Sequence, residues 1–475
     1  MRRRPWRTLV WLALAAWLAT AWWQTHKPLV PGTHVASPEC TVPAAAVAFL
    51  PDVTAADAYG HLSVRQGIFD ATLHAIAAAQ RFVVLDYERL AAAEGGYRML
   101  AGELTEALVK LRHERAQVRV LLLTDPVNER YGHGRSDELA LLRAAGVEVV
   151  SVPLGELRDP NFLYSAVTRL TLDWWGGPPG QAGALARRLE FKSAHRKLVI
   201  ADDGRGGLTA VVGSANPADR ESAWSNAALE VSGGPVAVLL RSELALAHGA
   251  GWRGDAAAFA SPTGCDADSS QAPSADQARV QVLTEGTIRQ ALLEQVSAAE
   301  RGDAIDLAAF RLADRGLLDE LLEAARRGVH VRLLLDPSED ATTLSTSGLP
   351  NQPLASELVA RSAGAVHVRW YRTHGERFHA AVARIAGTGR VWLLVGSANF
   401  TRRSLMDYNL EADVALGLAR DAPLAQASLA WFDQLWGNDA AQGIEYTADF
   451  ASFADPSQAD YWLGRWLEAS GLGGF

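Results

Sequence analysis

The chain has 475 residues, of which 49% are hydrophobic and 21% are charged, and its mean hydropathy is close to zero. This composition is typical of a folded globular protein and excludes a fibrous or disordered chain, and the length predicts two or three domains. The formal net charge of -9 at pH 7 disfavours sequence-independent binding of nucleic acid, because the overall electrostatic field of the protein repels polyanions.

The N-terminus has the pattern of a membrane-targeting segment. A basic stretch, MRRRPWR, precedes residues 8–23, which carry no charge. Basic residues stay on the cytoplasmic side, so the rest of the chain is expected to be exported. Two fates are open: residues 19–21 (ATA) suit cleavage by signal peptidase, whereas Trp22 and Trp23 suit the interface of a retained helix. We expect a single-pass inner-membrane protein with its catalytic part on the exported side, and secretion after cleavage is the alternative.

The two cysteines, Cys40 and Cys265, lie too far apart in the sequence for a zinc-ligand pair of the usual spacing. Export into an oxidising compartment favours a disulfide between them. Two unpaired thiols are the alternative, since the sequence alone does not show proximity.

A polar stretch rich in Ser, Pro, Asp and Gly divides the chain into two halves of similar length. We expect an N-terminal membrane segment at 1–30, a first lobe at 31–262, a linker at 263–277 and a second lobe at 278–475. In each half, short runs rich in Val, Ile and Leu alternate with helical patterns of about 10 to 15 residues. Each half is therefore predicted to be an α/β lobe, with a mixed β-sheet flanked by helices.

Each half ends in the same sequence motif. In the first half it is HRKLVIAD at 195–202, then GSAN at 213–216 and Glu230; in the second it is HAAVARIA at 379–386, then GSAN at 396–399 and Glu411. On a strand, His195 and Lys197 point to the same face, and the following turn adds Ser214 and Asn216. A cation, an amide, a hydroxyl and an imidazole together suit the binding and displacement of a phosphate group.

Two histidines, His195 and His379, can divide the work of displacement at phosphorus. One imidazole attacks as a neutral base while the other donates a proton to the leaving group, which a single group with a pKa near 6.5 does not readily do. Glu230 and Glu411, after the GSAN turns, are placed to orient the two rings through their far nitrogens.

These residues resemble the phospholipase D superfamily, with its HxKx4D and GSxN motifs, and GSANFTRRSLMDYNLEADV resembles the cardiolipin synthase-like branch. The resemblance implies two pseudo-twofold-related lobes with the active site at their interface, a phosphohistidine intermediate and no metal or other cofactor. It implies His195 as the nucleophile and His379 as the general acid. The other residues that it assigns are the phosphate ligands Lys197, Asn216 and Asn399, with Ser214 and Ser397 beside them; the histidine partners Glu230 and Glu411; and Asp202, whose role is structural.

The second motif departs from the family pattern. Ala381 stands where the family has lysine and Ala386 where it has aspartate, so half of the cationic clamp is missing. Losing one such donor can raise a barrier by about 2.7 to 4 kcal/mol. Arg377, two residues before His379, shares its face on an extended strand and is the candidate substitute.

We therefore predict a phospholipase D-type phosphodiesterase or phosphatidyltransferase that acts on phospholipid at a membrane. A nuclease and a lipid-binding pseudoenzyme are the alternatives, and no nucleic acid partner is expected. The sequence indicates neither the headgroup, nor the acceptor, nor the oligomeric state.

Overall fold

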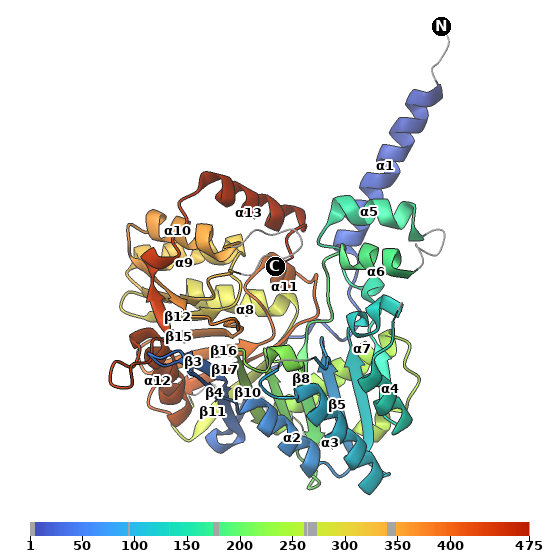
Figure 1. The fold of residues 1–475 in the computed structure, drawn as a ribbon, viewed down its shortest axis with the longest axis horizontal. Helices are drawn as coiled ribbons and strands as arrows, with labels where there is room; N and C mark the ends of the chain where they lie inside the picture. Colours follow the sequence, from blue (N-terminus) through green and yellow to red (C-terminus); the bar gives the residue numbers. More distant parts are fainter. Residues whose placement is uncertain are drawn as a thin grey trace.

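The computed structural model describes residues 5–93, 96–132, 134–173, 180–260, 264, 273–339 and 348–474. These residues form a mixed α/β fold with two large β-sheets and a two-stranded ribbon, β3 (Val53–Ala56) and β4 (Leu62–Arg65). Helices cover the outer faces of both large sheets (Figure 1).

The smaller sheet belongs to the first half of the chain. Its strands, in spatial order, are β2 (Val47–Pro51), β10 (Ala227–Ser232), β9 (Leu208–Gly213), β8 (Lys197–Asp202), β5 (Phe82–Tyr87), β6 (Arg119–Thr124) and β7 (Glu148–Ser151). β5, β6 and β7 run parallel, and β8 joins β5 in the antiparallel sense. The first motif thus lies on a central strand of this sheet.

In the larger sheet, the seven neighbouring strands from β11 to β14 repeat the strand order of the smaller sheet. Its strands, in spatial order, are β1 (Cys40–Pro43), β11 (Gln277–Thr284), β17 (Ala412–Ala419), β16 (Arg390–Gly396), β15 (Ala381–Ala386), β12 (Ala304–Ala309), β13 (His330–Leu335), β14 (Val366–Tyr371) and β18 (Thr447–Asp449). The antiparallel pairs β5–β8 and β12–β15 correspond, and so do the parallel strands beside them. The two motif strands are therefore equivalent elements of two repeated sheets.

The helices fill the connections between the strands. In chain order they are α1 (Pro5–His26), α2 (Ile68–Ala78), α3 (Leu100–Glu114), α4 (Asp137–Ala144), α5 (Phe162–Leu170), α6 (Gly180–Arg188), α7 (Gly234–Gly249), α8 (Gly286–Ser297), α9 (Arg315–Arg327), α10 (Asn351–Arg361), α11 (Arg402–Leu405), α12 (Pro423–Gly437) and α13 (Gln458–Ser470). α9 shows why such a segment is helical: Asp314 caps its first turn by accepting a hydrogen bond from Leu317, and Gly328 ends it with a φ of 89°.

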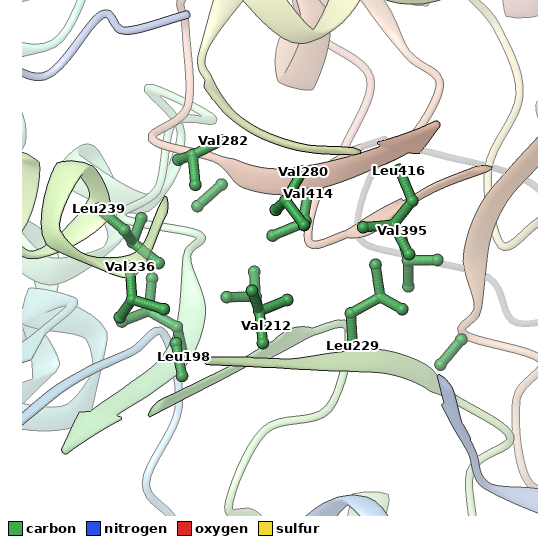
Figure 2. Close-up of a cluster of buried hydrophobic side chains, with 14 of the residues drawn as sticks. Leu198, Val212, Leu229, Val236, Leu239, Val280, Val282, Val395, Val414 and Leu416 are labelled. Carbon is green, nitrogen blue, oxygen red and sulfur yellow. The ribbon is translucent and has the colours of Figure 1, made fainter. Parts of the chain in front are cut away.

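The two sheets pack face to face around a shared apolar core. Leu198, Val212 and Leu229 of the smaller sheet lie opposite Val280 and Val414 of the larger one, and α7 closes one side (Figure 2). Side chains of a strand alternate between its two faces, so Val199 and Ala201 of β8 pack instead in a second cluster with residues of α2 and α3. Burying one Val or Leu side chain contributes about 1.5 to 3 kcal/mol, so this core fixes the two lobes against each other.

The N-terminal helix α1 extends away from the body and contacts it through α5, where Trp17 Nε1 donates a hydrogen bond to Leu163 O at 3.4 Å (Figure 1). Along this helix Trp6, Trp11 and Trp22 are exposed. None of the helices within the described ranges is both long enough and apolar enough to cross a membrane.

The boundary between the lobes differs from the expected ranges in one respect. Residues 40–43 fall in the predicted first lobe, but they form β1, which pairs antiparallel with β11 at the edge of the larger sheet. Cys40 is buried there and is not a free thiol. Cys265 lies outside the described residues, so its pairing with Cys40 stays a prediction.

Candidate active site at the lobe interface

Each motif histidine lies just before its motif strand, on a segment that pairs with the other lobe. The backbone N–H of His195 donates to Leu410 O at 3.0 Å, and the backbone N–H of His379 donates to Ser225 O at 2.7 Å. Both acceptors lie on the loops that follow the GSAN turns. The two lobes therefore build one site jointly, and each holds the histidine of the other.

His195 is held by a carboxylate from the second lobe. Its Nδ1 lies 2.9 Å from Oε2 of Glu411, whose side chain has no exposed surface. Glu411 also accepts hydrogen bonds from Ser397 Oγ at 2.6 Å and from Asn409 Nδ2 at 3.2 Å. A carboxylate at Nδ1 keeps the proton there and leaves the Nε2 lone pair for attack, which is the state that a nucleophilic histidine needs.

Glu88, which follows β5, faces the other nitrogen of the same ring. Its Oε2 lies 3.4 Å from His195 Nε2 and 3.0 Å from Lys197 Nζ. Burial alone would raise the pKa of Glu88, but the charge of the adjacent Lys197 ammonium holds it well below its usual value. An ionised carboxylate thus lies between the cation and the imidazole, where we expect an anionic oxygen of a substrate to bind.

His379 has a different environment. Its Nδ1 lies 3.1 Å from Oδ1 of Asn226, an amide in place of a carboxylate. Its ring packs against Trp224 and Phe310, with centroids at 5.1 and 4.7 Å. Of its side-chain surroundings, the two rings are apolar and the amide is neutral, so they do little to stabilise an imidazolium.

The pKa of His379 is lowered well below 6.5. Burial is the main cause, and the positive charges of Lys197 and Arg377 add to it. A base whose pKa is lowered is neutral above that pKa, so His379 carries no charge at neutral pH in the resting site.

The two GSAN turns show that Asn226 and Glu411 occupy equivalent places. Ser214 Oγ donates to Asn226 Oδ1 at 3.0 Å, as Ser397 Oγ donates to Glu411 Oε2. The next backbone N–H along the chain donates back to the same serine, at 3.2 Å after Asn226 and 3.0 Å after Glu411. The structure thus brings Ser214 and Ser397 beside the histidine partners.

The motif asparagines lie at the ends of these turns. Asn216 is 3% exposed, donates through Nδ2 to Glu221 at 3.0 Å and accepts from the backbone N–H of Arg89 at 3.2 Å. Asn399 is 8% exposed. Glu221 therefore fixes the orientation of the first of the two amides.

Glu230 is not a histidine partner, contrary to the expectation from the sequence. It lies on β10, opposite Ala48 of β2 and Val211 of β9. The reason is a difference in loop length. Asn226, which is bonded to Ser214, lies 12 positions after that serine, whereas Glu411 lies 14 positions after Ser397. Asn226 consequently takes the place that was assigned to Glu230.

Asp202 lies at the far end of β8 from the histidines. Its Oδ1 accepts hydrogen bonds from the backbone N–H groups of Arg81 at 2.7 Å and Phe82 at 2.8 Å. These bonds anchor the turn that leads into β5, which is a structural role. Ala386, its counterpart in the second motif, ends β15 without such a group.

Arg377 lies on the His379 side of the site. Its guanidinium lies over the ring of Trp224 at 4.8 Å and over that of Phe310 at 5.6 Å, so it packs on the same two rings as His379. Ala381 is buried at the start of β15 and offers no cation. The structure therefore places a cation near the second motif, from a different position than the family lysine.

Two aspartates that sequence reasoning missed position the histidine segments. Asp125, after β6, accepts from the backbone N–H of Ala194 at 2.8 Å, and burial raises its pKa to about 6. Asp336, after β13, accepts from the backbone N–H of Phe378 at 3.0 Å. The repeated Asp-Pro dipeptides after these strands were the available signal.

The comparison with known families agrees with the geometry. Residues 292–436 match the family model described as "Cardiolipin synthase, PLD-like domain". The matched residues lie in the second half of the chain and contain His379, the second GSAN turn and Glu411. No curated protein matches the sequence.

Solved structures resemble the fold over most of the chain. Phosphatidylserine synthase from Haemophilus influenzae Rd KW20 has a TM-score of 0.57 at 12% identity, over 90% of this chain and 94% of that chain. Polyphosphate kinase from Porphyromonas gingivalis (TM-score 0.48, 12% identity, 89% of this chain and 55% of that) and the phospholipase D family member Nuc from Salmonella typhimurium (0.28, 20%, 36% and 97%) are also similar. At 12% identity, the likeness to the phosphatidylserine synthase shows the fold alone.

Proposed function

We propose that the protein is a phospholipase D-type enzyme that transfers the phosphatidyl group of a phospholipid to an alcohol or to water through a phosphohistidine. The pairing of His195 with Glu411 across the two lobes carries the proposal. Glu411 orients the nucleophilic nitrogen and balances the positive charge that the ring gains when it bonds to phosphorus. Lys197 beside it supplies the charge that a phosphate oxygen needs.

The remaining residues follow from their places in a pseudo-twofold pair of lobes. Asn216 and Asn399 are proposed phosphate ligands, and Arg377 is the proposed second cation. His379 exchanges the proton of the group that leaves or arrives. Within the described ranges no three His, Cys, Asp or Glu side chains are grouped to hold a metal ion; independence of metal is itself part of the proposal.

The proposed substrate is a lipid, and the similarity of residues 292–436 to the cardiolipin synthase, PLD-like family model supports this proposal. The net charge of -9 disfavours nucleic acid. We further propose that the enzyme is exported and works at the membrane surface, with the exposed tryptophans of α1 at the lipid interface. Fractionation of cells that express the full chain, with protease added from the outer side, tests this location.

Trapping the intermediate tests the chemistry. The full-length protein in detergent, with EDTA, is mixed with phospholipids labelled at phosphorus and is quenched during turnover. We expect label on the wild-type chain that is stable to base and labile to acid, as for a phosphohistidine. His195→Ala is expected to abolish both the label and the product.

Three outcomes would contradict the proposal. Label that persists in His195→Ala would place the nucleophile elsewhere. Cleavage of single-stranded DNA without cleavage of lipid would make the protein a nuclease. Binding of lipid without turnover in the wild type, with turnover gained in Ala381→Lys, would make it a lipid-binding pseudoenzyme.

A further inference from the structure

The repeated lobes provide an internal comparison between the two histidines. Three residue positions around the ring of His195 have equivalent positions around the ring of His379, as the strand registers and the two turns show. Around His195 they hold Glu411, Lys197 and Glu88; around His379 they hold Asn226, Ala381 and Phe310. Each charged group on the His195 side is thus replaced by a neutral one on the His379 side.

These replacements act in the same direction on His379. The amide of Asn226 accepts the Nδ1 proton at 3.1 Å but does not balance a positive ring. Phe310 packs on the ring at 4.7 Å and excludes water from it. Burial and the nearby cations accordingly lower the pKa of His379 well below 6.5. A histidine in this setting is a poor source of protons at neutral pH.

We propose that the substrate is an activated lipid, in which the phosphatidyl group is joined through a phosphoanhydride to a nucleoside monophosphate, and not an unactivated phosphodiester. This inference rests on the proposed function and specifies its substrate class. An alcohol that leaves from a diester must be protonated, because it is about as weak an acid as water. A phosphate monoester has a second pKa of about 6 and leaves as the anion without a proton.

The first step then needs no general acid. Neutral His195 Nε2 attacks phosphorus, the P–N bond forms, and the bridging P–O bond breaks with its electron pair on the departing phosphate. The ring of His195 becomes cationic, and Glu411 at its Nδ1 stabilises that charge. The carboxylate is retained beside the ring that must carry a lasting positive charge.

The second step uses the neutral state of His379. His379 takes the proton of an alcohol or a water molecule while its oxygen bonds to phosphorus, and the P–N bond breaks and returns its electron pair to His195. The proton on His379 then passes to solvent, which the lowered pKa of this ring favours.

The surroundings of His379 suit a nucleotide as the leaving group. Arg377 supplies a positive charge for a departing phosphate, and its guanidinium lies over the ring of Trp224, 4.8 Å from the ring centroid. Trp224 is half-buried, so the part of its ring that stays exposed can pack against a base. A small neutral headgroup such as glycerol would use neither feature.

Two probes separate the substrate classes: CDP-diacylglycerol and phosphatidylglycerol in mixed micelles, with the full-length protein and EDTA. Stopped single turnovers report release of CMP or of glycerol. We expect kcat/KM for CDP-diacylglycerol to exceed that for phosphatidylglycerol by at least about 100-fold, the low end of what a general acid contributes. In His379→Ala we expect the first release of CMP to slow less than about 10-fold, and transfer to the acceptor to slow by about 100-fold or more.

Asn226→Glu restores the carboxylate, and Asn226→Gln is the matched control, with the same length and no charge. Only the Glu variant is expected to gain cleavage of phosphatidylglycerol. Cleavage of phosphatidylglycerol by the wild type at a rate equal to or above that of CDP-diacylglycerol would overturn the inference and leave the proposed function intact. If neither lipid labels His195, both fail. Melting curves identify variants that do not fold.

Discussion

Glu88 is expected to oppose substrate binding, and Glu88→Gln tests this directly. Its carboxylate lies 3.0 Å from Lys197 Nζ and 3.4 Å from His195 Nε2, the two groups that the phosphate of the proposed substrate contacts. The pKa of Glu88 is held well below its usual value, so the charge is present throughout the neutral range. A bound phosphate must therefore displace this carboxylate or accept its repulsion. The amide of Gln keeps the shape and removes the charge.

The magnitude follows from the geometry. Two like charges about 4 Å apart repel by about 4 kcal/mol at an effective dielectric constant of about 20. The side chain of Glu88 is 19% exposed, so water screens part of this repulsion. A remaining cost of about 1.4 to 2.8 kcal/mol corresponds to a 10- to 100-fold lower KM in Glu88→Gln. The rate constant kcat is expected to change less, because the effect is on binding.

The assay is the initial rate of lipid turnover against lipid concentration at constant ionic strength. Glu106→Gln is the matched control, since Glu106 is an exposed carboxylate on α3 and its loss changes the net charge equally. We expect KM to fall in Glu88→Gln and to stay constant in Glu106→Gln. A higher KM or an unchanged KM in Glu88→Gln would refute the reasoning, because the carboxylate would then assist the substrate or lie outside its path.

Two further substitutions test the frame of the site. Glu411→Gln replaces a charge-assisted bond to His195 by a neutral one, and we expect kcat/KM to fall about 10- to 100-fold; an unchanged burst of phosphohistidine would contradict this role. Arg196→Met leaves Glu243 and Glu285, now 2.6 and 2.7 Å from the guanidinium, buried without their cation, and we expect the free energy of unfolding to fall by about 3 to 5 kcal/mol. Burial raises the pKa of Glu285 to about 7, so its protonation eases the loss at low pH. Denaturant unfolding should show a larger loss at pH 8 than at pH 6, and equal losses would exclude this explanation.

The sequence predicted the parts of the site that depend on local spacing. The alternation of side chains on a strand predicted that His195 and Lys197 share one face. The repeat of the motif in the second half predicted that His379 occupies the position equivalent to His195. The expected α/β lobes are observed as two sheets with the same strand order. These features follow from periodicity, which a single sequence displays.

Pairings between the lobes were not predictable in the same way. Strand β1 pairs with the larger sheet, and Glu411 is hydrogen-bonded to His195 of the other lobe. Both contacts depend on how the surfaces of the two lobes pack against each other. Asn226 was missed because a carboxylate was expected and the first loop is shorter, so the matching position shifted away from Glu230. Glu88 was missed because nothing in its local sequence distinguishes a carboxylate that faces the site after a strand from one that faces solvent.

The arrangement makes each lobe dependent on the other for a working histidine. The first lobe supplies His195 and Lys197 but has only an amide at its own histidine-partner position, Asn226. The second lobe supplies Glu411 but lacks the motif lysine. The proposed nucleophile, His195, and the carboxylate that orients its ring therefore belong to different halves of the chain, and the backbone hydrogen bonds between the halves keep their bonded atoms 2.9 Å apart. A second motif without its lysine is consistent with this arrangement, because the second lobe contributes to the proposed nucleophile, His195, through Glu411 and not through a full copy of the motif. The groups around His379 are neutral, whereas the corresponding groups around His195 are charged. This difference gives the two histidines different proposed roles, which two identical lobes would not provide.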